Sequence, residues 1–210
     1  QGLLFEATKR QITYQEQKTY FDVLRLTVDD KYSWDFAMLG VGLRYINGVG
    51  KPDMLHYVES FGMEGHYDFA SNRGYIWSRT FPLLKRALLL GVGQDNFAYA
   101  FPNDDYVGKV NCGFNEQIVT KPHNMYLQIW VQDGLPALLA FLALYLLLFG
   151  RTIRKCFKKG KWNHSQKISL AFLCGVSGYF AAGLANDSSI CVAPVFWVLF
   201  GVAFAVLRNE

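Results

Sequence analysis

The chain has 210 residues, of which 51% are hydrophobic, and its 21 basic and 17 acidic side chains give a formal net charge of +4. Seven of the Lys and Arg residues, and no acidic residue, lie in 151–167. Such a loop between apolar segments is a signal of membrane topology, so the net charge gives no support to nucleic-acid binding. The four cysteines have no CxxC or Cys/His ligand spacing. We therefore expect no metal and no cofactor.

The first third of the chain carries weak signals. Short strand-like stretches occur at 12–14 and 19–27, and the pattern at 34–46 indicates a helix that ends at a group of Gly and Pro residues. His56 and His66 have no partners at metal-ligand spacing. We expect both to be ordinary surface histidines.

A helix is better defined within 71–90. Apolar and aromatic residues recur there at three- and four-residue spacing from Trp77 onward, and Pro82 predicts a kink or a break. Arg73 lies in the first turn, where a guanidinium can bind phosphate through two hydrogen bonds or can simply meet lipid headgroups. Arg79 is a second candidate for substrate binding, although contact with headgroups or water is the more ordinary role for it.

The segment after this helix begins with Gly91-Val92-Gly93. A lone Gly-x-Gly can cradle a phosphate, but it more often forms a helix C-cap and a turn. Asp104 and Asp105 follow in a turn, and adjacent carboxylates lack the separation of a glycosidase pair. We expect no chemistry from these two residues.

The sharpest local signal is Lys121-Pro122-His123-Asn124. Pro122 is well placed to start a helix, and the Tyr and Trp residues that follow are of the kind that settle at the headgroup level of a bilayer. His123 is therefore expected at the outer membrane interface, beside Asn124 and Lys121. A histidine there can act as a general base, or it can cap the helix or contact headgroups.

Three uncharged apolar segments follow, at 134–150, 168–185 and 190–207. Their 17 or 18 residues cover roughly 27 Å as helices, close to the hydrocarbon thickness of about 30 Å. Since basic loops stay on the cytoplasmic side, 151–167 faces inward and 1–128 faces outward. These features predict a multi-pass protein.

The expected fold class is an all-α integral membrane protein, with a transmembrane helix bundle and a large, mostly helical extracytoplasmic loop. Asp187 lies in the short loop between the last two apolar segments, where a solvated loop tip is favoured over a substrate role. The chain begins at Gln1 without a preceding span, so we expect it to be the C-terminal piece of a larger protein. The expected domains are an extracytoplasmic loop, an interfacial segment with a transmembrane helix, a cytoplasmic loop and a transmembrane hairpin, at 1–128, 129–150, 151–167 and 168–207.

Three blocks, in order, resemble the O-antigen ligase and O-antigen polymerase (Wzy-type) superfamily. His123-Asn124, nine residues and then Gly134 are similar to its signature of His, then Asn, Ser or Gln, then nine residues and Gly. The Ser-Asn-Arg-Gly-Tyr-Ile-Trp stretch at 71–77 looks like its arginine block, and 91–97 looks like its Gly-x-Gly block. One departure is Ala137, where family members often have a second Gly.

The resemblance implies an inverting, metal-independent glycosyl transfer at the outer face of the bacterial cytoplasmic membrane. The donor would be a glycan on undecaprenyl pyrophosphate, and the acceptor a glycan, lipid or protein hydroxyl. By the same resemblance, His123 would take the proton of the acceptor and Arg73 would bind the pyrophosphate. Asn124 would orient His123 or the sugar, and Lys121 would add positive charge.

Two alternatives stay open. A polymerase, which joins lipid-linked repeat units to one another, shares this architecture with a ligase. The second alternative is not an enzyme: a non-catalytic membrane subunit with an extracytoplasmic binding module. The apolar segments carry no ionised side chain, which argues against an ion-coupled transporter.

Overall fold

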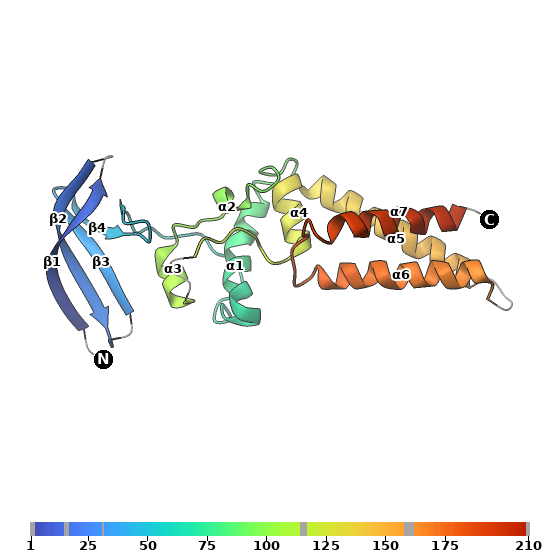
Figure 1. Ribbon diagram of the computed structural model, residues 1–210, viewed down its shortest axis with the longest axis horizontal. Coiled ribbons are helices and arrows are strands. Elements are labelled where there is room, and N and C mark those ends of the chain that lie inside the picture. Colours follow the sequence, from blue (N-terminus) through green and yellow to red (C-terminus); the bar gives the residue numbers. More distant parts are fainter. Residues whose placement is uncertain (1–2, 15–16, 31, 114–116, 158–161, 209–210) are drawn as a thin grey trace. The chain divides into compact units, whose positions relative to one another are not determined.

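The computed structural model describes residues 3–14, 17–30, 32–113, 117–157 and 162–208. The chain forms two compact units (Figure 1). The first consists of Gln1–Glu59 with Pro102–Ile118, and the second of Ser60–Phe101 with Val119–Glu210. The second unit holds all the residues that the sequence singles out for chemistry.

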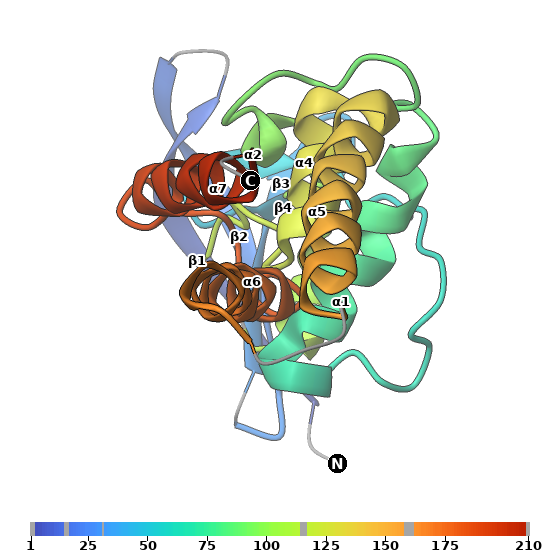
Figure 2. The same cartoon turned by 90° about the vertical axis from the view of Figure 1, so that its right-hand side faces the viewer.

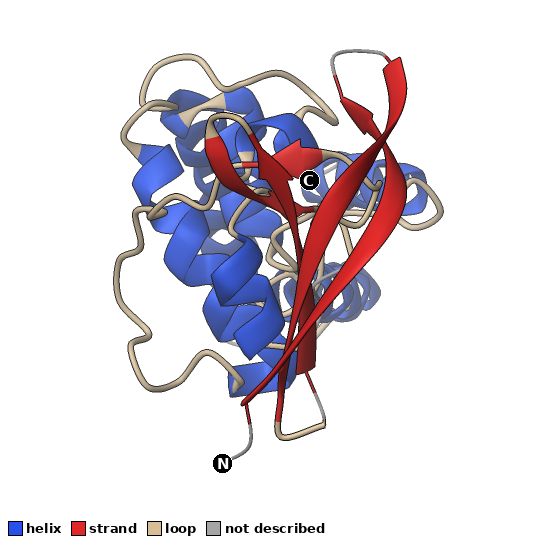
Figure 3. Ribbon diagram, turned by 90° about the vertical axis from the view of Figure 1, so that its left-hand side faces the viewer, coloured by secondary structure: helices blue, strands red, loops and turns tan. Residues whose placement is uncertain are grey.

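The first unit is built on a five-stranded antiparallel sheet in which neighbours in sequence are neighbours in space. Figure 3 shows that the two longest strands form a strongly twisted ribbon. Twist of this kind is the ordinary consequence of backbone sterics in L-residues. The strands are β1 (Leu3–Tyr14), β2 (Gln17–Val28), β3 (Tyr32–Leu39), β4 (Gly42–Ile46) and β5 (Pro52–Asp53).

The helix predicted at 34–46 is wrong, because this segment forms β3, a tight turn and β4. Trp34 and Phe36 are two residues apart and therefore share one face of the sheet. Phe36 pairs with Tyr45 across the hairpin, and their rings meet edge to face at 6.0 Å. Gly42 has φ +106°, a conformation that glycine adopts without strain, and it begins the returning strand.

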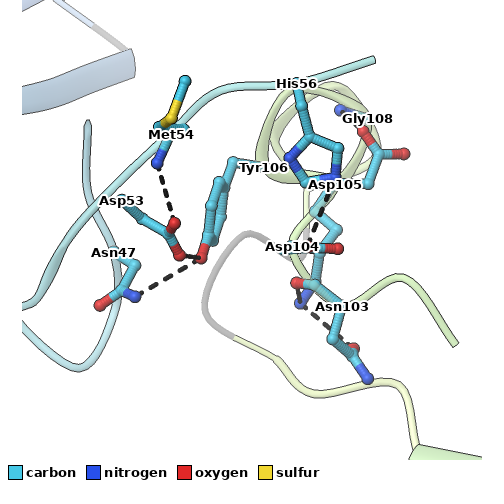
Figure 4. Close-up of polar contacts among 10 residues, drawn as sticks. Asn47, Asp53, Met54, His56, Asn103, Asp104, Asp105, Tyr106 and Gly108 are labelled. Atoms are coloured by element: carbon cyan, nitrogen blue, oxygen red, sulfur yellow. Dashed lines mark hydrogen bonds and ion pairs between the residues drawn. The ribbon is translucent and has the colours of Figure 1, made fainter. Parts of the chain in front are cut away.

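The segment 102–118 returns to this sheet and carries the short helix α3 (Tyr106–Asn111). Figure 4 shows its polar contacts with the strands. The Tyr106 hydroxyl donates to Asp53 at 2.5 Å and accepts from Asn47 at 3.4 Å, and its ring centroid lies 4.7 Å from that of Tyr45. Burial, followed by the bond to Asp53, raises the pKa of Tyr106 to about 12.

The second unit is helical, and Figure 2 looks along its last three helices, which lie side by side. Their core is largely aromatic. Tyr145 of α5 stacks on Phe180 of α6 at 4.1 Å, and Tyr179 of α6 stacks on Phe196 of α7 at 4.0 Å. The helices are α1 (Phe69–Leu84), α2 (Phe97–Ala100), α4 (Met125–Asp133), α5 (Leu135–Cys156), α6 (His164–Ala182) and α7 (Ala193–Arg208).

The predicted all-α fold class is wrong. Besides the sheet, the described residues contain one helix, α5, that is long and apolar enough to cross a membrane. Helix α7 is apolar but has 16 residues, because it begins at Ala193 and not at the start of the apolar run at 190. Helix α6 begins in the polar sequence 164–167, which lowers its hydropathy, and ends at Ala182.

Candidate active site

The signature spacing of nine residues corresponds to helix α4, which separates Asn124 from Gly134. Asn124 is its N-cap, and its side-chain oxygen accepts the N–H groups of Tyr126 and Leu127 at 3.0 Å each. Gly134 is its C-cap, with φ +94°, and a Cβ there would lie 2.6 Å from the carbonyl oxygen of Leu89. The nine-residue spacing is therefore the length of the helix between its N-cap residue and its C-cap residue.

The Gly-x-Gly block packs against the end of the same helix. Val92 N–H donates to the Val131 carbonyl at 2.8 Å, and Gly93 N–H donates to the Gln132 carbonyl at 2.9 Å. A Cβ on Gly91 would lie 2.0 Å from the backbone of Gln132. The backbones approach so closely that glycine is required, and the block therefore acts as a packing turn.

His123 immediately precedes α4 and pairs with an acidic residue from the loop between α6 and α7. Its Nδ1 lies 2.9 Å from Oδ2 of Asp187. The other carboxylate oxygen accepts the N–H of Asn124 at 3.2 Å. The imidazole is half exposed, whereas the Asp187 side chain is 10% exposed. His123 also has φ +52°, a strained conformation of the kind that concentrates at functional sites.

The loop that carries Asp187 is fastened to the start of α4 by three more hydrogen bonds. Nδ2 of Asn124 donates to the Leu184 carbonyl at 2.8 Å, and Met125 N–H donates to the Gly183 carbonyl at 2.8 Å. Ser188 N–H donates to Oε1 of Gln128 at 2.9 Å. These bonds hold the carboxylate in place beside the imidazole. Asn124 thus serves both the helix cap and the loop.

A cavity of about 460 Å³ opens beside this pair. Lys121, His123 and Asp187 line it together, so a cation, an imidazole and a carboxylate meet in one space. The loop side chains of Asn186 and Ser189 add polar groups to its wall. The cavity combines groups that can bind an anion with one that can accept a proton.

Arg73 is not among the residues that line this cavity, but its helix is tied to the His123 segment. One turn after Arg73, Nε1–H of Trp77 donates to the Pro122 carbonyl at 2.8 Å. Arg73 donates through Nη1 to the Ala70 carbonyl at 2.9 Å, while its Nε is buried with no hydrogen-bond partner in the described part of the chain. The Nε–H is enclosed by protein atoms, so an anion would meet Arg73 at the exposed end of its guanidinium, where Nη1 lies.

The residues before Arg73 have an unusual backbone. Ala70, Ser71 and Asn72 have φ values of +49°, +61° and +67°, so regular helix begins after them. Three consecutive left-handed residues other than glycine are strained. This strain lies within the block that precedes the candidate anion-binding arginine.

Arg79 lies elsewhere, in the packed interior of the second unit. Its guanidinium is 4.8 Å from the ring centroid of Tyr67 and 4.5 Å from that of Tyr75, and it donates to Oγ of Ser78 at 2.9 Å. Contact with two rings stabilises a cation away from water. The side chain is 8% exposed, so a role in substrate binding stays a prediction.

Asp187 is the site residue that sequence reasoning passed over in favour of a solvated loop tip. One signal for it was present. The topology predicted from the sequence places the 186–189 loop and His123 on the same side of the membrane, and Asp187 is the acidic residue of that loop. Its pairing with His123 is a tertiary contact, however, and no spacing in a single sequence encodes it.

Comparison with known proteins gives one match. A family model described as O-antigen ligase matches residues 32–142, which is more than half of the chain. The matched range contains Arg73, His123 and the whole of α4. Searches of curated proteins and of solved structures found no match.

Proposed function

Because the chain belongs to the O-antigen ligase family, we propose that it transfers a glycan from an undecaprenyl-pyrophosphate carrier to an acceptor hydroxyl. The family implies a bacterial membrane protein that acts as a glycosyltransferase-like enzyme on lipid-linked glycans. In this proposal the protein crosses the cytoplasmic membrane more than once, with 1–128 outside and 151–167 inside. The observation that carries the proposal is the His123–Asp187 pair in a cavity that also holds Lys121.

His123 acts as the base. Its Nδ1–H donates to the Asp187 carboxylate, which leaves the lone pair of Nε2 to take the proton of the acceptor hydroxyl. The acceptor oxygen bonds to the anomeric carbon as the bond from that carbon to the phosphate oxygen breaks. The electron pair leaves with the pyrophosphate, and attack from the opposite face inverts the anomeric centre.

Positive side chains stabilise the leaving pyrophosphate, and no metal takes part. Lys121 lines the same cavity as His123, and the Nε–H of Arg73 has no hydrogen-bond partner among the residues that the structure describes. Charge-assisted hydrogen bonds to phosphate are shorter and stronger than neutral ones. Asn124 acts indirectly, because its side-chain oxygen caps α4 and its amide holds Leu184. It positions both members of the His123–Asp187 pair.

The test uses the full-length protein in its own host at matched membrane levels. His123→Ala and Arg73→Ala are expected to accumulate undecaprenyl-linked glycan and to lose transferred surface glycan. His56→Ala is the matched control, since His56 also faces a carboxylate, that of Asp104 at 3.4 Å, but lies in the first unit. If all three variants transfer glycan as the wild type does, the catalytic assignment is wrong and a binding role accounts better for the site.

The length of the lipid-linked glycan separates a ligase from a polymerase. Long lipid-linked chains that are never transferred indicate a ligase, whereas single repeat units that are never extended indicate a polymerase. His123→Ala in the native host shows which of the two products is lost.

A further inference from the structure

A second cavity, of about 710 Å³, adjoins the one beside His123. It is bounded by α4, α5, the start of α7 and the turn that contains Gln94 and Asp95. Four residues line both cavities: Lys121, Met125, Tyr179 and Ser189. The two spaces are therefore neighbours with a shared wall, while the His123–Asp187 pair belongs to the first alone.

Two buried carboxamides of α4 line this second cavity. Gln128 is 7% exposed and Gln132 is 4% exposed, and they lie one helical turn apart on the same face. Oε1 of Gln128 accepts the N–H of Ser188. Among the described residues, no hydrogen bond joins the Gln132 carboxamide or the Gln128 side-chain nitrogen to a partner. The unbonded atoms are not among the fully enclosed ones of the described residues, so they reach the cavity and are placed to bind a ligand there.

The rest of the lining is polar at one end and apolar at the other. At the polar end, Nε2 of Gln94 donates to Oδ1 of Asp133 at 2.6 Å, with Asp95 beside it in the lining. At the apolar end lie Phe141 and Trp197, whose rings contact each other. Amides and carboxylates suit sugar hydroxyls, which both donate and accept, and aromatic rings suit the C–H faces of a pyranose.

The charged side chains in the lining of the second cavity favour a sugar over a pyrophosphate as its ligand. Asp95 and Asp133 bring two carboxylates, and Lys121 is the cation of the described lining. Carboxylates repel a phosphate at short range. The first cavity holds one carboxylate, that of Asp187, which is paired with His123. The pyrophosphate is therefore expected beside His123 and Lys121, and not at this polar end.

We infer that this second cavity binds an uncharged sugar ring of the glycan substrate, next to the reacting sugar. Asn124 is adjacent to the proposed base, His123, and Gln132 lies about 12 Å from Asn124 along the helix axis. The sugar ring bound by Gln132 is therefore not the ring that reacts. The inference rests on the proposed glycosyl transfer. The ring belongs either to the donor glycan or to the acceptor glycan, since both present the same hydroxyl chemistry.

The test measures transfer by the purified full-length protein, with undecaprenyl-pyrophosphate glycan and acceptor isolated from the host. Gln132→Leu keeps the size of the side chain but removes its hydrogen bonds, and Ala140→Leu fills the cavity from α5. Both are expected to raise KM for one substrate about tenfold, with kcat within about twofold of the wild type. Gln117→Leu, at an exposed glutamine of the first unit, is the control.

The substrate whose KM rises identifies the source of the ring. If KM for both substrates is unchanged in Gln132→Leu and Ala140→Leu while His123→Ala abolishes transfer, the sugar site is wrong and the proposed function stands. If the wild type and all variants, His123→Ala included, give the same transfer as a reaction without the protein, both proposals are wrong.

Discussion

The imidazole of His123 and the carboxylate of Asp187 lie 2.9 Å apart, although one precedes α4 and the other follows α6. The same carboxylate also accepts the backbone N–H of Asn124. Both of its oxygens are thus engaged at the start of α4. In the proposed mechanism, Asp187 therefore sets the position of the imidazole and keeps the proton on Nδ1.

Asp187→Asn is expected to reduce kcat about 10²-fold, the lower end of the contribution of a positioned base. The amide keeps the shape of the carboxylate but no longer requires Nδ1 to be the protonated nitrogen. KM for both substrates is expected to stay within about twofold, because Asp187 acts through His123. Steady-state kinetics of the purified protein measure both constants.

Asp104→Asn is the matched control for this substitution, because it alters the other histidine–carboxylate pair, that with His56. It is expected to leave kcat unchanged. Two results would assign Asp187 a structural role only. One is a fall in kcat in Asp104→Asn equal to that in Asp187→Asn, and the other is a large loss of thermal stability in Asp187→Asn.

Gly91→Ala is expected to destabilise the second unit by about 1–3 kcal/mol, the usual cost of overpacking. The new Cβ would lie 2.0 Å from the Gln132 carbonyl, and neither backbone can move freely because Gly93 is bonded to the same carbonyl. Thermal unfolding in detergent measures the change. Gly150→Ala serves as the control, since no neighbouring atom lies within 4 Å of a Cβ there. Equal stability of the two variants would contradict the tight packing.

Local signals in the sequence indicated which segment carries the candidate site, while the roles of its residues stay predictions. Pro122 predicted a helix start close to His123. The helix α4 instead begins at Met125 with Asn124 as its N-cap, so Pro122 and His123 lie just before it. The turn interpretation of 91–93 follows from the same local chemistry. Asp187 could not be placed in this way, because its role depends on a loop brought to α4 by hydrogen bonds from Leu184 and Ser188.

The fold was harder to predict, for a different reason. In 34–46 the aromatic residues fit both helical and alternating spacing over so short a range, and the hairpin depends on the turn before Gly42. For the last two apolar segments, the composition predicted spans of 18 residues. Helix α6 begins instead at His164, where Asn163 and Gln166 form a capping box, and α7 begins at Ala193.

Asp35→Asn is expected to destabilise the sheet by about 1.5–3 kcal/mol at neutral pH, the usual contribution of a hydrogen bond to a charged group. Arg25 donates to both carboxylate oxygens, at 2.7 and 2.9 Å. Hydrogen bonding to Arg25 and the charge of Arg10 outweigh burial and hold the pKa of Asp35 below its ordinary value. A carboxyl with a lowered pKa contributes stability above that ordinary value and loses it as the pH falls.

The destabilisation by Asp35→Asn should therefore shrink below about pH 4, where the wild type also loses the ion pair. Thermal unfolding of the full-length protein at neutral pH and at about pH 3 tests this. Asp22→Asn is the control, since its pair with Lys9 is exposed and 3.9 Å long, and no measurable change is expected. A pH-independent difference between Asp35→Asn and the wild type would exclude the ion pair as its cause.

Tyr106→Phe is expected to remove a hydrogen bond between the 102–118 segment and the sheet, and this bond is lost at alkaline pH. The pKa of Tyr106 is raised to about 12, so the protonated hydroxyl is favoured in the folded protein. Its contribution is complete below about pH 10, the ordinary pKa of tyrosine, and is lost as the pH rises through about 12. Below pH 10 the variant should lose about 1 kcal/mol, one buried hydrogen bond. Titration of tyrosinate absorbance in wild type and variant checks the assignment. Burial also raises the pKa of Tyr126, which is present in both proteins. Loss of a tyrosine that ionises near pH 10, with every late-ionising tyrosine retained, would show that the bond to Asp53 does not hold the proton on Tyr106.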